Sequence, residues 1–138
     1  MVFEKRKSGY FAYITENENG NITSFLLLKE EKYQDILGII EKFDWKKMER
    51  ENKILKISSF KVINPGNGIG TEYLKIVYKR ATKIKVSIIY VTVYPKYKEF
   101  IKFLENNGFT LYKKIKDDSL KKGKDECDEE IVLIKCYK

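Results

Sequence analysis

The spacing of apolar positions changes several times along the chain, and each change predicts a new structural element. Residues 9–28 carry apolar and aromatic runs on both sides of residues 16–21, ENENGN. Asparagine and glycine adopt turn conformations readily, so this segment predicts a β-hairpin. The apolar residues after it recur every three or four positions, which predicts a short helix over residues 31–43. The charged segment 44–52, which contains Trp45, predicts a connection to the next strand.

Residues 53–62, KILKISSFKV, show an alternating side-chain pattern that predicts a strand. The face that this alternation defines comprises Ile54, Lys56, Ser58, Phe60 and Val62. Because the alternation is imperfect, both faces of the strand are expected to be covered. The turn-forming residues 63–68 stop the strand, and a helix follows to about Thr82. The apolar face of this helix comprises Gly70, Tyr73, Leu74, Val77 and Ala81.

Residues 86–93, VSIIYVTV, form an almost unbroken β-branched run, which is typical of a strand buried on both faces. Pro95 is expected to begin a third helix, which Asn107 and Gly108 end. The apolar stripe of that helix comprises Tyr97, Phe100, Ile101 and Leu104.

Two final strands are predicted at residues 109–116 and 130–137, joined by the polar loop 117–128. Strand–helix–strand crossovers in the middle of the chain imply parallel pairing, and hairpins at the ends imply antiparallel pairing. The expected fold is therefore an α/β (α+β) fold, a mixed sheet with helices packed on it. The chain has 138 residues, enough for one hydrophobic core and too few for two ordinary ones, so we expect a single domain over residues 1–138.

Composition excludes several kinds of chemistry. The sequence has no histidine, which rules out Ser-His-Asp and Cys-His catalysis and removes the commonest transition-metal ligand. Its cysteines, Cys127 and Cys136, match no metal or redox spacing, so no metal site is predicted. No apolar run approaches the ~18 residues of a spanning helix, and the N-terminus lacks the apolar stretch of a secretory signal. We therefore expect a cytoplasmic protein with no membrane-bound part.

The net charge is +8, from 28 basic and 20 acidic residues, and it attracts polyanions. A phosphate-bearing cofactor and a nucleic acid both fit this charge, and so does a lysine-rich composition imposed by the genome. No aromatic RNA-binding motif, zinc finger or basic zipper is present. Nucleic acid is therefore a possible partner that no motif supports.

The segment most informative about function is residues 54–74, where a strand, a glycine-rich turn and a helix start follow one another. Glycines at 66, 68 and 70 allow positive φ and close approach of the backbone to a ligand. The first turn of the helix exposes unpaired N–H groups that bind phosphate oxygens, and Thr71 adds a hydroxyl. The alternative is a tight turn that needs glycine only for its geometry.

Other phosphate-binding loops fit this segment less well. A Walker motif requires Lys-Ser/Thr directly after its last glycine, and Gly70 is followed by Thr71 and Glu72. The dinucleotide fingerprint requires a third glycine or alanine where this chain has Tyr73.

Residues 65–71, PGNGIGT, followed by Tyr73 and Leu74, resemble the Arg/Gln-x-x-Gly-x-Gly/Ala motif of the Gcn5-related N-acetyltransferases. Residues 103–109, FLENNGF, resemble the later helix of that family, which ends in Gly-Phe. The two motifs occur in the family's order, with a buried strand between them.

The resemblance implies a centrally splayed mixed sheet with helices on both faces and acetyl-CoA as cosubstrate. The pantetheine arm would pair with the main chain of residues 57–62, and the turn 66–71 would hold the pyrophosphate. The cofactor-binding residues that it implies are Ser58, Phe60, Lys61, Val62, Gly66, Asn67, Gly68, Ile69, Gly70 and Thr71. The thioester would lie between strands 54–62 and 86–93, where strand amides polarise its carbonyl. A primary amine, whose identity the sequence leaves open, would attack the acetyl carbon directly.

Three features depart from the family pattern. Pro65 replaces the usual Arg or Gln, so one side-chain contact to phosphate is lost. Leu104 occupies the place of the tyrosine that often serves as general acid. Tyr97 and Tyr94 are candidate substitutes, with packed aromatic rings as the alternative interpretation. No carboxylate lies in the strand 53–62, so Ser59, Ser58 or a water would have to assist as base.

The N-terminus also departs, because family members usually begin with a strand and two helices that wall the acceptor site. Here the predicted hairpin starts almost at once. Either the chain is a shortened domain of a longer protein, or residues 31–52, including Tyr33 and Trp45, form the wall. A non-catalytic acyl-CoA-binding module is a second hypothesis, which Pro65 and Leu104 support. A small basic nucleic-acid-binding protein, whose affinity falls steeply with salt, is a third.

Overall fold

The computed structural model describes residues 2–32, 53–63, 68–86, 88–116 and 129–136. In chain order the described elements are β1 (Val2–Lys7), β2 (Tyr10–Glu16), β3 (Ile22–Lys32), β4 (Lys53–Val62), α2 (Ile69–Ile84), β5 (Ile88–Val93), α3 (Lys98–Asn106), β6 (Thr110–Lys116) and β7 (Glu129–Cys136). The seven strands belong to a mixed sheet with the order β1-β2-β3-β4-β5-β7-β6, which confirms the α/β class. The chain divides into two compact units, Met1–Ile89 and Tyr90–Cys136, which are described separately below. Among the described helices, none has the length and apolar character needed to cross a membrane.

The first unit begins with a strand that the sequence pattern did not predict. The expected hairpin over residues 9–28 corresponds to β2 and β3, and β1 pairs antiparallel with β2 ahead of them. Ser8 and Gly9 join β1 to β2 with φ of 48° and 84°, the positive values that a tight two-residue hairpin turn requires. The sequence of β1, VFEKRK, lacks the alternation of apolar residues that marks a half-buried strand.

The predicted helix over residues 31–43 is wrong at its start. Glu31 and Lys32 are the last residues of β3 and pair with Ile54 and Lys53 of β4. The strand extends this far because β4 supplies backbone partners over its whole length, which outweighs a local helical spacing. The rest of that prediction, with the predicted wall of the acceptor site, lies outside the described residues.

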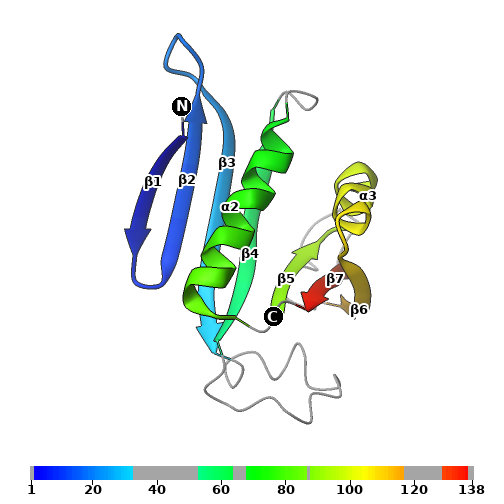
Figure 1. Cartoon of the computed structure of the whole chain (residues 1–138). Coiled ribbons are helices and arrows are strands. Elements are labelled where there is room, and N and C mark those ends of the chain that lie inside the picture. The colour runs from blue at the N-terminus through cyan, green and yellow to red at the C-terminus, as the bar shows by residue number, and fades with distance from the viewer. Residues whose placement is uncertain (1, 33–52, 64–67, 87, 117–128, 137–138) are drawn as a thin grey trace. The chain divides into compact units, whose positions relative to one another are not determined.

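Helix α2 packs against β3 and β4 and completes the core of the first unit (Figure 1). The fully buried side chains of this layer include Leu26, Leu28, Tyr73, Leu74, Val77 and Ala81. The Tyr73 hydroxyl lies 2.7 Å from Thr15 Oγ1 and 2.9 Å from Ser24 Oγ. A hydroxyl that is buried without such partners is costly, so these contacts allow a tyrosine here and fix α2 over β2 and β3.

The second unit contains β5 from Tyr90 onward, α3, β6 and β7, with β6 and β7 antiparallel. Helix α3 starts at Lys98, three residues later than expected, because Pro95 and Lys96 form a turn in which Tyr97 N donates to Tyr94 O at 3.1 Å. Its end is confirmed: Asn107 is the C-cap, and Gly108 follows with φ of 93°.

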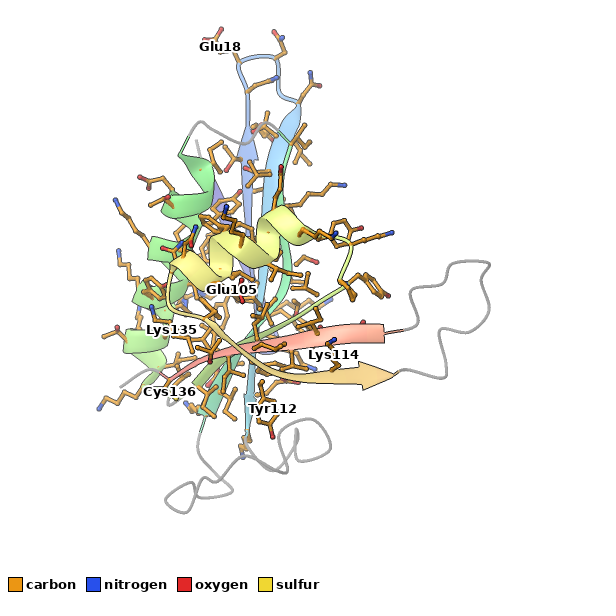
Figure 2. All side chains as sticks on the ribbon, turned by 90° about the vertical axis from the view of Figure 1, so that its right-hand side faces the viewer. Glu18, Glu105, Tyr112, Lys114, Lys135 and Cys136 are labelled. Atoms are coloured by element: carbon orange, nitrogen blue, oxygen red, sulfur yellow. The ribbon has the colours of Figure 1, made fainter. Side chains whose placement is uncertain are left out.

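The C-terminal end of α3 is held by β7. Lys135 Nζ donates to Asn107 O at 2.8 Å, so a cation sits at the negative end of the helix dipole (Figure 2). Leu104 of α3 and Phe109 are buried in this unit, with Val132, Leu133 and Ile134 of β7.

Candidate functional site

Strand β4 contains a β-bulge at Ser58. Leu27 of β3 pairs with Ser59, whereas the next residue, Leu28, pairs with Ile57, so Ser58 has no partner in this ladder. A bulge leaves main-chain groups unpaired and turns the strand locally. In the sequence, the only sign of this bulge is the pair Ser58 and Ser59 in an otherwise apolar and basic strand.

The bulge overturns the single face that alternation assigned to β4. Side chains alternate along a strand, so an extra residue at Ser58 reverses the faces on either side of it. The register places Phe60 opposite Leu26 on the side that faces α2, and Phe60 packs edge-on against Tyr73 with ring centroids 5.8 Å apart. Lys56 belongs to the other face, because it lies an odd number of ladder positions from Phe60.

The first helical hydrogen bond of α2 runs from Glu72 N to Gly68 O at 3.0 Å. The amides of Ile69, Gly70 and Thr71 precede it and therefore have no acceptor within the helix. Within the described residues, no side chain caps this end of the helix. These three amides lie at the positive end of a 16-residue helix, where an anion is stabilised by both donors and dipole.

Gly68 is the N-cap of α2 and adopts φ 78° and ψ 2°. This left-handed conformation favours glycine, and a Cβ built on Gly68 would meet no heavy atom within 4 Å. The position therefore favours glycine for its backbone, and among the described residues the space in its Cβ direction is open. Gly68 and Thr71 are exposed, and Ile69 and Gly70 are half-buried.

The remaining predicted cofactor residues are placed as follows. Ser58, Phe60 and Val62 are half-buried in β4, and Lys61 is exposed. Gly66 and Asn67 lie outside the described residues, as does Pro65.

The candidate catalytic residues have different environments. Ser59 is half-buried in β4, directly after the bulge. Tyr97 is 51% exposed, so it does not belong to the core. Its ring centroid lies 6.4 Å from that of Tyr94, and Lys96 Nζ lies 5.3 Å from its centre. Leu104 has an exposed fraction of 0% and is the buried residue of α3, so it contributes to the core of the second unit.

A charged cluster fixes the other half of α2 to β1 and β2. Arg80 is 8% exposed, and its Nη2 donates to Glu4 Oε2 at 2.6 Å and to the Tyr13 hydroxyl at 3.1 Å. Its guanidinium also lies 4.3 Å from the centre of the Phe11 ring. The cluster thus fixes α2, the helix whose first three amides have no helical acceptor.

The same contacts perturb the two acidic groups of the cluster. Burial acts to raise the pKa of Glu4, but the Tyr13 hydrogen bond and the charges of Arg6 and Arg80 outweigh it and hold that pKa below its ordinary value. Burial also raises the pKa of Tyr13, against the lowering effect of the hydrogen bond from Arg80.

No protein-family model and no curated protein sequence matches the chain. Solved structures do match. They include Chaetomium thermophilum Naa20 in complex with a bisubstrate analogue, at a TM-score of 0.70 and 18% identity, over 91% of this chain and 65% of that one. Arabidopsis thaliana NAA60 in complex with acetyl-CoA matches at a TM-score of 0.74 and 13% identity, over 95% of this chain and 78% of that one. A GNAT family acetyltransferase from Elizabethkingia anophelis with acetyl-CoA bound matches at a TM-score of 0.65 and 15% identity, over 94% of this chain and 77% of that one.

This chain spans 65% of the Naa20 chain, just under two thirds of its length. The similarities extend over 91–95% of this chain at identities of 13–18%. What they establish is the architecture. The chain has the fold of the Gcn5-related N-acetyltransferases.

Proposed function

We propose that the protein is an acetyl-CoA-dependent N-acetyltransferase that transfers an acetyl group to a primary amine by direct attack. The observation that carries the proposal is the N-terminus of α2. A glycine in the left-handed conformation opens the helix, its Cβ direction is empty, and three main-chain amides after it have no helical acceptor. A pyrophosphate is an anion that such an arrangement suits.

Each part of the chain then has a distinct role. The amides of Ile69, Gly70 and Thr71 bind phosphate oxygens, and the exposed Thr71 hydroxyl adds a fourth donor. The main chain of β4 around Ser58 pairs with the amides of the pantetheine arm, because the bulge frees backbone groups there. Acetyl-CoA supplies an activated thioester, whose acetyl group is the one transferred.

The reaction also needs a group that takes the proton of the amine and a group that protonates the thiolate. The attacking amine must lose a proton, and the Ser59 hydroxyl or a water beside it relays that proton to solvent. The exposed Tyr97 hydroxyl is the candidate donor to the departing thiolate. Leu104 has no ionisable group, so the usual acid position contributes only packing.

A second function, acyl-CoA binding without turnover, is favoured by the complete burial of Leu104. Such a binding module would keep the phosphate-binding N-terminus of α2 and would lack the general acid. Release of free thiol from acetyl-CoA in the presence of a panel of primary amines separates the two functions, since a binding module gives a titration signal and no thiol.

The site itself is tested by placing a carboxylate at Gly68. Gly20 offers a matched control: it has φ of 81°, against 78° at Gly68, and a Cβ at either position meets nothing within 4 Å. Gly68→Asn and Gly20→Asn impose the strain of a side chain at positive φ, and the corresponding aspartates add one negative charge. Titration calorimetry with CoA measures the affinity of all four variants.

We expect Gly68→Asp to bind CoA at least about tenfold more weakly than Gly68→Asn, because a carboxylate a few ångströms from phosphate costs about 1–3 kcal/mol at a solvated site. The aspartate and asparagine variants of Gly20, at the tip of the β2–β3 hairpin, should bind equally. Equal affinities for the two Gly68 variants would refute the phosphate site.

A further inference from the structure

The outer face of α2 carries a regular row of cations. Lys75, Lys79 and Lys83, called the α2 lysine row below, are exposed and follow one another at intervals of four residues. Four residues advance about 6 Å along a helix and turn about 40° beyond a full rotation, so the three ammonium groups stay on one side. The apolar side chains of α2 face β3 and β4, which leaves this side to solvent.

Acidic residues do little to neutralise the row. Glu72 is the one carboxylate in the sequence of α2, and it lies 3.9 Å from Lys75 in a contact where both side chains are at least 66% exposed. Such an exposed pair contributes little. Lys79 and Lys83 form no ion pair with any residue in the described ranges.

Arg6 of β1 extends the row. Its guanidinium lies 5.7 Å from the centre of the Phe11 ring, and that of Arg80 lies 4.3 Å from the same centre. Arg6 and Arg80 therefore lie against the same ring. Its side chain is 55% exposed, whereas the Arg80 side chain is 9% exposed and binds Glu4. Glu4 contacts both arginines, and Arg6 is the more exposed of the two cations.

We propose that the α2 lysine row and Arg6 form a docking surface for the phosphate backbone of a nucleic acid duplex. A duplex presents phosphates at regular spacing along each strand, so a row of lysines can contact several of them. The helix holds its lysines at fixed spacing, which suits a rigid and regularly charged partner. Contacts to the phosphate backbone do not depend on the base sequence.

The composition of the face separates a duplex from other anionic partners. The exposed residues of α2 are Thr71, Glu72, Lys75, Lys79, Thr82 and Lys83. None is apolar, so the face has nothing to insert into a membrane interface. None is aromatic, and single-stranded nucleic acids are bound largely by stacking on aromatic rings. Protein interfaces are depleted of lysine, which disfavours an acidic protein surface.

The proposal is tested with the full chain and a labelled 20-base-pair RNA duplex, beside a DNA duplex of the same sequence, by fluorescence anisotropy. Four phosphate contacts predict a slope of about −3.6 for log affinity against log salt, or about a 150-fold loss from 50 to 200 mM. Replacing the three lysines of the row with glutamine should change the slope to about −0.9. Lys98→Gln, Lys102→Gln and Lys114→Gln together remove the same charge from exposed positions of the second unit and serve as the control (Figure 2).

Retention of the slope in the control and its loss in the row variant, with far-ultraviolet circular dichroism unchanged in both, would support the proposal. Equal weakening by the two triple variants would overturn it, because net charge alone would then explain binding. The absence of duplex binding at 50 mM salt would also overturn it. So would binding of the row to phosphatidylserine vesicles in place of the duplex. The outcome is independent of the Gly68 variants, which test acetyl-CoA binding.

Discussion

Replacing Arg80 with methionine should destabilise the first unit by about 2 kcal/mol at neutral pH. The change keeps most of the aliphatic volume but removes the hydrogen bonds of Arg80 Nη2 to Glu4 at 2.6 Å and to Tyr13 at 3.1 Å. A hydrogen bond to a charged group contributes about 1.5–3 kcal/mol, and the guanidinium 4.3 Å from the Phe11 ring adds about 0.5–1 kcal/mol. Regaining the hydration that the buried arginine lost offsets part of this sum.

Two features keep the expected loss moderate. Tyr13 retains its own hydrogen bond to Glu4 Oε2 at 3.0 Å, so no buried hydroxyl is left without a partner. The Glu4 side chain is 39% exposed and can be hydrated again. The free energy of unfolding is measured by urea denaturation. Arg6→Met is the matched control, because Arg6 also contacts Glu4, at 3.5 Å, but is 55% exposed and should contribute less than about 1 kcal/mol.

The loss should also depend on pH. The folded-state pKa of Glu4 is lowered, so the stability that this carboxylate contributes is present above its unfolded pKa of about 4.3 and is lost as pH falls through the folded value. Without Arg80 the lowering is smaller. The difference between wild type and Arg80→Met should therefore narrow as the pH falls from about 5 to 3.

A double-mutant cycle with Glu4→Gln isolates the pair. We expect a coupling energy of about 1 kcal/mol or more at pH 7 that declines in acid. Coupling near zero, or a cost for Arg80→Met no larger than that of Arg6→Met, would refute the view that this cluster fastens α2 to β1.

Two further changes test packing and capping. Leu104→Ala should cost about 2–5 kcal/mol of unfolding free energy because the side chain is 0% exposed, and a cost below about 1 kcal/mol by the same denaturation would contradict its place in the core. Lys85→Gly should instead raise stability by about 0.5–1 kcal/mol, because Lys85 closes α2 at φ 58°, a conformation that glycine adopts without strain. A lower melting temperature for this variant would show that the lysine side chain contributes more than the strain costs.

The local sequence pattern was sufficient to predict most of the elements in the middle of the chain. Helix α2, the buried strand β5 and the end of α3 at Asn107 follow from side-chain spacing and from glycine, which act between residues one to four apart. The start of α3 was misplaced by three residues because Pro95 suits a turn as well as the first position of a helix.

The features that local pattern missed depend on distant partners. Strand β1 is charged, and it is fixed by β2 and by contacts such as that between Glu4 and Arg80, which lie 76 residues apart. The bulge at Ser58 exists only in the register between β3 and β4. Glu31 and Lys32 lie at the edge of a helical spacing but follow the backbone partners that β4 offers.

The candidate site divides in the same way. The prediction of an anion site at residues 66–71 could be made from the sequence, because positive φ and free amides are properties of the backbone and its immediate neighbours. The exposed fraction of Tyr97, the burial of Arg80 and the emptiness beyond Gly68 were decided by tertiary packing. Burial and open space are set by side chains brought together from separate parts of the chain, and no local spacing records them.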